Sequence, residues 1–251
     1  MKDQLAKQEQ YYGLGEDYFW FRGHNAVVEE QVAAHLDRAA RGSSRTLRLV
    51  DVGCGPGNTI RRFSRWGRVL GIDYSLDALA FARRKGVTDV ASADVTALPI
   101  ASAAADGVLA LEVLEHVEDD RAALREIARI LRPGGIVAIT VPAFMSLWRH
   151  HDEAYGHCRR YTKRELADRA SSAGLEVISC QYFKCAFFLP MWTMAAWERA
   201  GFPNRRDSYV TVPSWLNRAL AAEIVWEARS GLARHAPFGS ALLCVGRRRE
   251  R

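Results

Sequence analysis

The segment from His150 to Tyr161, HHDEAYGHCRRY, gathers side chains that could do several kinds of chemistry. It holds three histidines, two acids, two arginines and two tyrosines within twelve residues. Histidine can accept a proton near neutral pH or bind a metal ion, and the planar guanidinium of arginine matches a carboxylate or a phosphate. The segment alone is compatible with a metal site, a nucleic-acid patch or a grip on a charged small substrate. Its position in the fold has to decide between them.

A second group of suggestive residues follows two β-rich runs near the middle of the chain. Gly53, Gly55 and Gly57 in DVGCGPG allow backbone amides to approach a ligand closely at the start of a helix. Asp73 lies 20 residues after Gly53, where an acid can accept hydrogen bonds from ribose hydroxyls. A dinucleotide-binding GxGxxG motif would need glycine at position 58, and this chain has Asn58. The spacing therefore does not fit a dinucleotide.

The elements that position these residues alternate between short β-rich runs and helical runs from Leu47 onward. This alternation predicts stacked βα units and a mostly parallel sheet, whose ligands bind beyond the carboxyl ends of the strands. Ser75 is expected to cap one helix, and Thr162 with Glu165 forms a capping box for another. Strands are predicted at 47–52, 68–73, 87–94, 106–113, 135–141, 174–183 and 240–247, and helices at 58–66, 75–85, 118–131 and 162–173.

Two segments depart from this alternation and are predicted to be additions laid over one edge of the sheet. Residues 1–46 are expected to form an N-terminal helical lid, and residues 184–238 a helical cap rich in aromatic side chains. Residues 47–183 and 239–251 then form a single core. The apolar face predicted within the cap either completes the core, closes over an apolar substrate, or contacts a second subunit or a membrane surface.

Five motifs in order, DVGCGPG, the acidic GID, SADVTALP, LEVLEHV and LRPGG, resemble those of class I methyltransferases that use S-adenosylmethionine. The resemblance covers residues 47–142 approximately and returns weakly in the last strands. It implies a Rossmann-like α/β fold with a seven-stranded, mostly parallel sheet and helices on both faces, together with the lid and the insertion. It also implies that S-adenosylmethionine is the cofactor and S-adenosylhomocysteine the product.

The resemblance assigns the methionine end of the cofactor site. The turn from Gly53 to Gly57 would hold the methionine portion, with Asp51 near its amino group, and Glu112 would line this end through its backbone. Arg22, which follows an aromatic run in DYFWFRGHN, is a candidate cation for the methionine carboxylate; simple packing of that run is the alternative. His116 is expected to be the residue that starts a helix below the cofactor, with catalysis as the alternative.

The resemblance also assigns the adenosine end. Asp73, with Tyr74 next to it, would bind the ribose, and Asp94 with the backbone of Val95 would read the edge of the adenine. The alternative for Asp94 is an aspartate that caps its own turn.

The acceptor is expected to meet the segment that opens this section, because the segment directly follows the fifth strand. His157, His151 and Tyr161 are the candidate catalytic residues, since transfer to a hydroxyl requires removal of a proton. His151, Asp152 and His157 could also be arranged around a metal ion, but the acids of a magnesium site usually come from several strand ends, so no metal is predicted.

Arg159 and Arg160 are expected to clamp an anionic group of the acceptor, with Trp148 beside them. The alternative is that Arg159 pairs with Asp152 or Glu153 and pins the loop. Both interpretations hold if one arginine serves each purpose.

Composition limits the remaining choices. The chain has 251 residues with 49% apolar and 25% charged residues, as expected for one globular protein, and its five cysteines form no CxxC pair. The net charge of +6 is scattered except for a terminal arginine cluster, so no nucleic-acid partner is predicted. No signal peptide is visible, so a cytoplasmic location is expected.

We therefore predict a methyltransferase acting on a small or lipid-like acceptor, with O-methylation of an acceptor that carries an acidic group as the favoured reaction. The alternatives are N- or C-methylation, an RNA or protein substrate, and a non-catalytic module that binds the cofactor. A monomer or a homodimer and a peripheral contact with a membrane surface are both compatible with the sequence.

Overall fold

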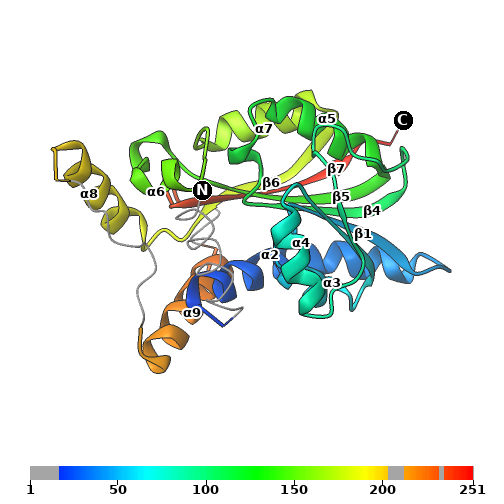
Figure 1. Cartoon of the computed structure of the whole chain (residues 1–251), viewed down its shortest axis with the longest axis horizontal. Coiled ribbons are helices and arrows are strands. Elements are labelled where there is room, and N and C mark those ends of the chain that lie inside the picture. Colours follow the sequence, from blue (N-terminus) through cyan, green and yellow to red (C-terminus); the bar gives the residue numbers. More distant parts are fainter. Residues whose placement is uncertain (1–16, 203–211, 232–234, 251) are drawn as a thin grey trace.

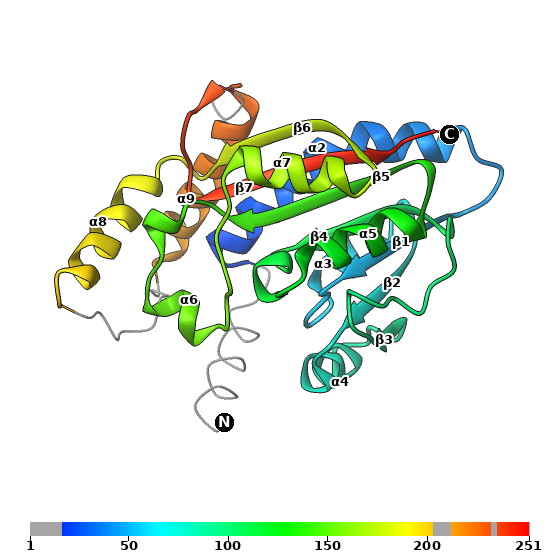
Figure 2. The ribbon, with the colours of Figure 1, turned by 90° about the horizontal axis from the view of Figure 1, so that it is seen from above.

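The computed structural model describes residues 17–202, 212–231 and 235–250, and a seven-stranded sheet runs through it. The strand order is β3-β2-β1-β4-β5-β7-β6. β7 runs antiparallel to both of its neighbours, β5 and β6, and the other neighbouring pairs are parallel (Figure 2). The strands are β1 (Leu47–Val52), β2 (Gly67–Asp73), β3 (Val90–Ser92), β4 (Ala105–Leu111), β5 (Leu131–Pro142), β6 (Leu175–Phe183) and β7 (Ala241–Arg248). The predicted α/β fold with a mostly parallel seven-stranded sheet is confirmed.

Helices cover both faces of the sheet (Figure 1). Successive residues of a strand point to opposite faces, so β1 sends Val50 and Val52 to one core layer and Leu49 to the other. The first layer contains side chains of α5 (Asp120–Ile130) and α7 (Lys163–Ser172). The second contains side chains of α2 (Phe19–Arg41), α3 (Asn58–Phe63), α4 (Leu76–Arg84) and α9 (Ser214–Arg229).

The helix α2 lies across a face of the sheet and not at its edge, where the sequence placed it. Its Val28 and Val32 are fully or almost fully buried in the same layer as Leu109 of β4. The α9 helix of the insertion packs against it. Gly23 allows this close approach, because a Cβ there would lie 2.9 Å from the Cβ of Ile224. The first 16 residues of the predicted lid lie outside the described residues.

The insertion contributes α8 (Phe188–Arg199) and α9, which differ in how they pack. In α8, Ala195 is the buried residue, and Figure 1 shows this helix standing apart from the sheet. The exposed large apolar side chains of the two helices are Leu189, Trp192, Met194, Trp197, Trp215 and Trp226. None of the described helices is both long and apolar enough to cross a membrane.

The local capping signals are found where the sequence placed them. The Ser75 hydroxyl accepts the N–H of Ala78 at 3.2 Å at the start of α4. At the start of α7, Thr162 and Glu165 form the reciprocal capping box.

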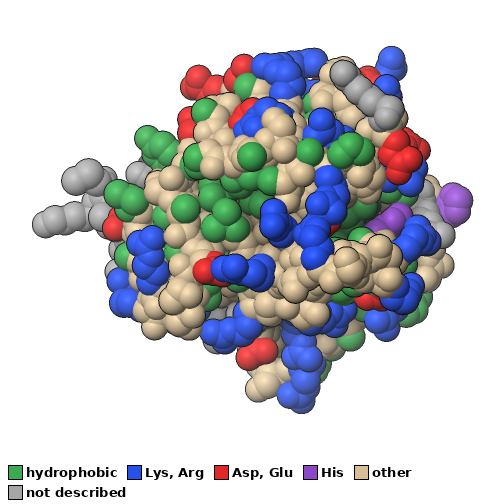
Figure 3. Space-filling model, turned by 90° about the vertical axis from the view of Figure 1, so that its right-hand side faces the viewer, with side chains coloured by type: hydrophobic (Ala, Val, Ile, Leu, Met, Phe, Trp, Pro, Cys, Tyr) green, Lys and Arg blue, Asp and Glu red, His purple; other side chains and the backbone are tan. Residues whose placement is uncertain are grey.

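The arginines of the terminal cluster that the structure describes serve the fold in part. Arg247 pairs with Glu176 at 3.0 Å across the β6–β7 ladder, and Arg248 donates to the carbonyl oxygens of Arg129 and Leu131. The last member of the predicted cluster, Arg251, lies outside the described residues. Figure 3 shows the side of the molecule that lies at the right of Figure 1, where basic side chains spread around apolar ones.

Candidate active site

Two adjoining cavities lie at the carboxyl ends of the parallel strands, and Gly53 and Glu112 line both of them. One cavity extends along the ends of β2 and β3, past Asp73, Asp94 and Val95. The other extends from the glycine turn toward α2, the segment after β5 and α8. Its lining includes Trp20, Phe21, His24, Gly55, Glu115, His151, Tyr155, His157, Arg160 and Met191. Because they share these two residues, the cavities form one cleft that joins the ends of β2 and β3 to α2 and α8.

The glycine turn is shaped so that backbone faces the cleft. Gly53, Gly55 and Gly57 all have positive φ angles of 70°, 50° and 78°, a region that strongly favours glycine. A Cβ at Gly53 would overlap the side chain of Val113, whereas a Cβ at Gly55 would meet no atom within 4 Å. Gly55 therefore borders open space in the cavity, and a larger side chain would project into it.

Two acids flank this turn in different states of pairing. Asp73 is already used within the turn, because its carboxylate accepts the N–H groups of Gly55 and Ser75, each at 2.8 Å. Asp51 is almost fully buried, and its Oδ2 has no hydrogen-bond partner among the described residues. Burial, with a smaller contribution from the charge of Asp73, raises the pKa of Asp51 to about 8. Asp51 belongs to neither lining, but it lies two residues before Gly53, which lines both cavities. An unpartnered buried carboxyl next to this turn is an appropriate partner for an ammonium group.

The residues predicted for the adenosine end line the first cavity, but they differ in burial and in hydrogen bonding. Val95 is buried, and Tyr74 is 80% exposed at the mouth. Asp94 is exposed and accepts both the N–H and the hydroxyl of Thr96, at 2.8 and 2.7 Å, which also lowers its pKa. Asp94 thus caps its own turn while it lines the cavity, so its two interpretations are compatible.

Arg22 does not reach the cleft, contrary to the expectation from sequence. It is exposed and belongs to neither lining, whereas its neighbours on α2, Trp20, Phe21, His24 and Asn25, line the second cavity. In a helix these four positions share a face, and position 22 points away from it. The helical period of the segment was the signal that could have identified them.

A buried cation, Lys184, lies behind this wall and was not identified from the sequence. Its ammonium group sits 3.6 Å from the centre of the Trp20 ring, and burial lowers its pKa to about 8. His24 stacks on Phe183 and lies 3.1 Å from the hydroxyl of Thr140. Burial, with a smaller contribution from Lys184, holds the pKa of His24 well below its usual value, so this imidazole is neutral.

The two predicted clamp arginines are both engaged by acids of the protein. Arg160 is buried and forms a bidentate pair with Asp152, Nε to Oδ1 at 2.8 Å and Nη2 to Oδ2 at 3.0 Å. Arg159 lies 3.3 Å from Asp120 and donates to the carbonyl oxygen of Glu118. Loop pinning was predicted for Arg159 through Asp152 or Glu153. Arg159 instead pairs with Asp120, and it is Arg160 that pairs with Asp152. Arg160 still lines the second cavity, and Arg159 does not.

Two further predicted residues lie outside the cleft. Tyr161 is 1% exposed, and its hydroxyl donates to Asp120 at 2.7 Å, so burial and this carboxylate raise its pKa above the usual value. It belongs to neither lining and supports the fold instead. The indole N–H of Trp148 donates to Glu153 at 3.3 Å, and Trp148 also lies outside both linings.

His151 and His157 do reach the second cavity, and a carboxylate orients one of them. The Nδ1 atom of His157 lies 2.8 Å from Oδ1 of Asp152, an acid that is 0% exposed and whose pKa the contacts with His157 and Arg160 hold near 2 against the opposing effect of burial. Burial lowers the pKa of His151 to about 4, so its imidazole is neutral at physiological pH. The Asp152 carboxylate thus fixes both His157 and Arg160.

The short helix η1 (Leu114–His116) adds two residues, of which sequence reasoning singled out only His116. Glu115 is 0% exposed, and burial together with Glu112 raises its pKa well above the usual value. The rings of His116 and His157 meet edge to face, with centroids 4.7 Å apart. Burial, with a smaller contribution from His157, lowers the pKa of His116 to about 4. The Glu-His pair in the segment that follows β4 was the available signal for Glu115.

Comparison with known proteins agrees with this geometry. A family model described as a methyltransferase domain matches residues 50–139. The malonyl-[acyl-carrier protein] O-methyltransferase of Enterobacter lignolyticus is 29% identical over 84% of this chain and 86% of its own length. The ubiquinone biosynthesis O-methyltransferase of Caulobacter vibrioides is 37% identical over a segment that makes up 45% of this chain and 49% of that relative.

The fold is shared with solved methyltransferase structures. Phosphoethanolamine N-methyltransferase 2 of Haemonchus contortus, solved with S-adenosyl-L-methionine, superimposes with a TM-score of 0.55 at 18% identity, covering 88% of this chain and 53% of that one. At this identity the similarity concerns the arrangement of the elements only.

Proposed function

We propose that this chain, which belongs to the class I S-adenosylmethionine-dependent methyltransferases, transfers a methyl group to an oxygen atom of a small acceptor. The cofactor supplies a methyl carbon that a nucleophile can attack in line with the bond to sulfur. The chain's own tasks are to hold the donor, to align the acceptor oxygen, to exclude water and to take up a proton.

The residues of the cleft fit this cofactor. The unpartnered Oδ2 of Asp51 suits the ammonium of the methionine portion, and the open space at Gly55 suits its chain. Asp73, although it holds the turn, keeps lone pairs for the ribose hydroxyls. Asp94 and Val95 border the end that would take the adenine.

The proposal that oxygen is attacked is carried by one observation: two imidazoles, His151 and His157, line the cavity beyond the glycine turn. Neutral imidazole accepts a proton from a hydroxyl, which O-methylation of an alcohol or phenol requires. The two named relatives are both O-methyltransferases, which supports the same choice. Trp20, Phe21 and Met191 supply apolar walls for the body of the acceptor.

The prediction that the acceptor carries an acidic group can no longer be based on the two arginines. The two arginines expected to bind it are engaged by Asp152 and Asp120, so they offer no ready clamp. The malonyl group named in one relative is an acid. We therefore propose that the attacked atom is either a hydroxyl oxygen or a carboxylate oxygen.

Calorimetry with S-adenosylhomocysteine tests the cofactor site. We expect binding by the wild type and loss of binding in Gly55→Val, whose side chain would fill the cradle. Gly174→Val is the matched control, because Gly174 also has a positive φ, 92°, and no neighbour within 4 Å, but lies between α7 and β6. Absence of binding by the wild type, or equal binding by both variants, contradicts the proposal.

Methyl transfer from labelled cofactor to a panel of hydroxy acids, phenols, amines and RNA tests the attacked atom. Base-labile label identifies a methyl ester and base-stable label on a phenol identifies an ether, and either supports the proposal. Label found only on nitrogen, carbon or RNA contradicts O-methylation. Cofactor binding without turnover on any extract of host metabolites favours a non-catalytic module.

A further inference from the structure

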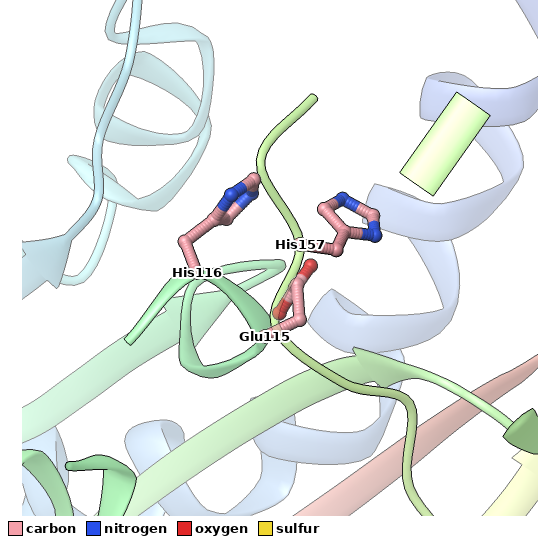
Figure 4. A group of neighbouring side chains, drawn as sticks. All are labelled: Glu115, His116 and His157. Carbon is pink, nitrogen blue, oxygen red and sulfur yellow. The ribbon is translucent and has the colours of Figure 1, made fainter. Parts of the chain in front are cut away.

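We propose that Glu115, His116 and His157 form a binding site for one divalent transition-metal ion at the boundary of the two cavities. One ligand atom from each of the three side chains lies within 4.8 Å of the others. Figure 4 shows that Glu115 and His116 extend from η1 and His157 from the segment after α6 (His150–Ala154), and that in this view the backbone of that segment passes between the two imidazoles. Ligand atoms about 2.1 Å from one ion lie roughly 3–3.5 Å from one another. Small shifts of the three side chains would therefore bring these atoms to coordinating distance.

Glu115 is the observation that points to a ligand. Its side chain is 0% exposed, and neither carboxyl oxygen has a hydrogen-bond partner among the residues that the structure describes. Buried polar atoms of proteins are nearly always partnered, and a carboxyl group with two unpartnered oxygens is costly to keep in the interior. A bound cation would satisfy this carboxyl group and offset the cost of burying it.

His157 is held as metal-binding histidines usually are. Its Nδ1 is hydrogen-bonded to Asp152 at 2.8 Å, which leaves Nε2 as the atom available to an ion. Asp152 is in turn fixed by Arg160 and by the backbone N–H of Arg149 at 2.9 Å. The imidazole is therefore oriented by a carboxylate that is itself immobile.

The two segments that supply the ligands are tied together by their backbones. The N–H of Cys158 donates to the carbonyl oxygen of Glu115 at 2.6 Å. The guanidinium of Arg159 donates to the carbonyl oxygen of Glu118 at 2.8 Å. The contacts of Arg159 therefore help to keep the segment with His157 against η1.

The ligand set selects the class of ion. Two imidazoles and one carboxylate suit Mn²⁺, Fe²⁺, Co²⁺ or Zn²⁺ better than Mg²⁺ or Ca²⁺, which prefer oxygen ligands throughout. Three protein ligands leave at least one coordination position open.

A catalytic role for the open coordination position rests on the proposed function, whereas the metal site itself does not. Glu115 and His157 line the acceptor cavity, so an acceptor oxygen can reach the ion. A hydroxyl bound there loses its proton more readily, first to His151 and then to water. Its lone pair forms the new O–C bond, and the electrons of the broken C–S bond stay on sulfur.

Titration calorimetry tests the site. Protein freed of metal with a chelator is titrated with Mn²⁺, Co²⁺ and Zn²⁺, and we expect one ion per chain. Glu115→Gln, His116→Ala and His157→Ala are expected to weaken binding by more than about 100-fold, beyond the usual effect of changing a residue that only supports a ligand. His150→Gln is the matched control, because this histidine is in the same segment but exposed, 3.6 Å from Glu153, and should bind like the wild type.

Retained melting temperature and S-adenosylhomocysteine affinity show that a variant is folded, and Glu115→Gln preserves shape if the histidine variants do not fold. No binding of any of the three ions by the wild type, or unchanged binding in Glu115→Gln, overturns the site. Ion binding with full activity of the chelated enzyme overturns its catalytic role alone. Ion binding lost in the variants, together with no O-methylation under any condition, leaves the site supported and contradicts the proposed function.

Discussion

At the scale of single residues, the protonation of Asp51 links the fold to cofactor binding. A pKa near 8 means that this buried carboxyl carries a proton in the free chain at neutral pH. An ammonium group placed beside it would favour the ionised form and lower its pKa. The cost of burying the acid would then be offset when the cofactor binds.

We expect S-adenosylhomocysteine binding to release close to one proton from Asp51 at pH 7. Because the ligand prefers the ionised carboxyl and the free pKa is about 8, affinity should rise with pH, by up to about tenfold per unit, and level off above pH 8. Calorimetry in phosphate and in Tris, whose ionisation enthalpies differ, measures the proton release. Asp51→Asn should bind more weakly, without this release and with a flat profile between pH 6 and 8. The same release in Asp51→Asn would show that another group is responsible.

Individual side chains also show where sequence reasoning stops. The residue types of the acceptor segment predicted a role for His151 and His157, and both line the cavity. They could not reveal that Arg160 belongs to Asp152, because an arginine that binds a ligand and one that pins a loop look alike in sequence. Arg22 was chosen for its charge, whereas the helical period of the segment places His24, and not Arg22, on the same face as Trp20.

At the scale of elements, the contact between α2 and α9 depends on Gly23. The N–H of Phe19 is capped by the side chain of Asn217 at 2.7 Å, and Arg229 pairs with Glu30 at 2.8 Å, so contacts at both ends of α9 hold it against the first half of α2. Between these contacts Gly23 faces Ile224, with no space for a side chain.

Gly23→Ala is therefore expected to destabilise the protein by about 1–3 kcal/mol, the usual cost of overpacking. This sign is opposite to that of an ordinary helical Gly→Ala change, which gains roughly 0.5–1 kcal/mol. Urea unfolding measures the difference. In Gly23→Ala with Ile224→Ala, the loss should be smaller than the sum of the two single losses. Additive losses, or a stabilised Gly23→Ala, would mean that the helices do not approach this closely.

The elements differ in how well the sequence predicts them, according to the range of the interactions that form them. Ser75 and the Thr162–Glu165 box act within three residues, so the starts of α4 and α7 were predictable. The helix predicted at 118–131 ends one residue earlier, at Ile130, and the strand predicted to begin at residue 135 begins directly after it, at Leu131. The place of α2 depends on α9, almost 200 residues away, and no local pattern contains that information.

At the scale of the whole molecule, the cleft joins parts that are distant in the chain. Its lining takes Trp20 from α2, the turn after β1, Glu112 after β4, Met191 from α8, and Ser240 with Ala241 at the start of β7. A ligand in this cleft therefore contacts the core together with the two segments that the sequence treated as additions. We infer that residues 17–41 and the insertion unfold with the core and not as separate domains.

Saturating S-adenosylhomocysteine should then raise the melting temperature of the whole chain in one transition. At a concentration about 100 times Kd the stabilisation is about 2.7 kcal/mol, which for a chain of this size corresponds to roughly 5–10 °C. Hydrogen exchange should slow in α2 and at the start of β7 as well as in the glycine turn, because all of them line the cleft. Gly55→Val should show neither effect at the same concentration. Two separate transitions, of which the ligand shifts only one, would mean that α2 and α9 form a unit of their own.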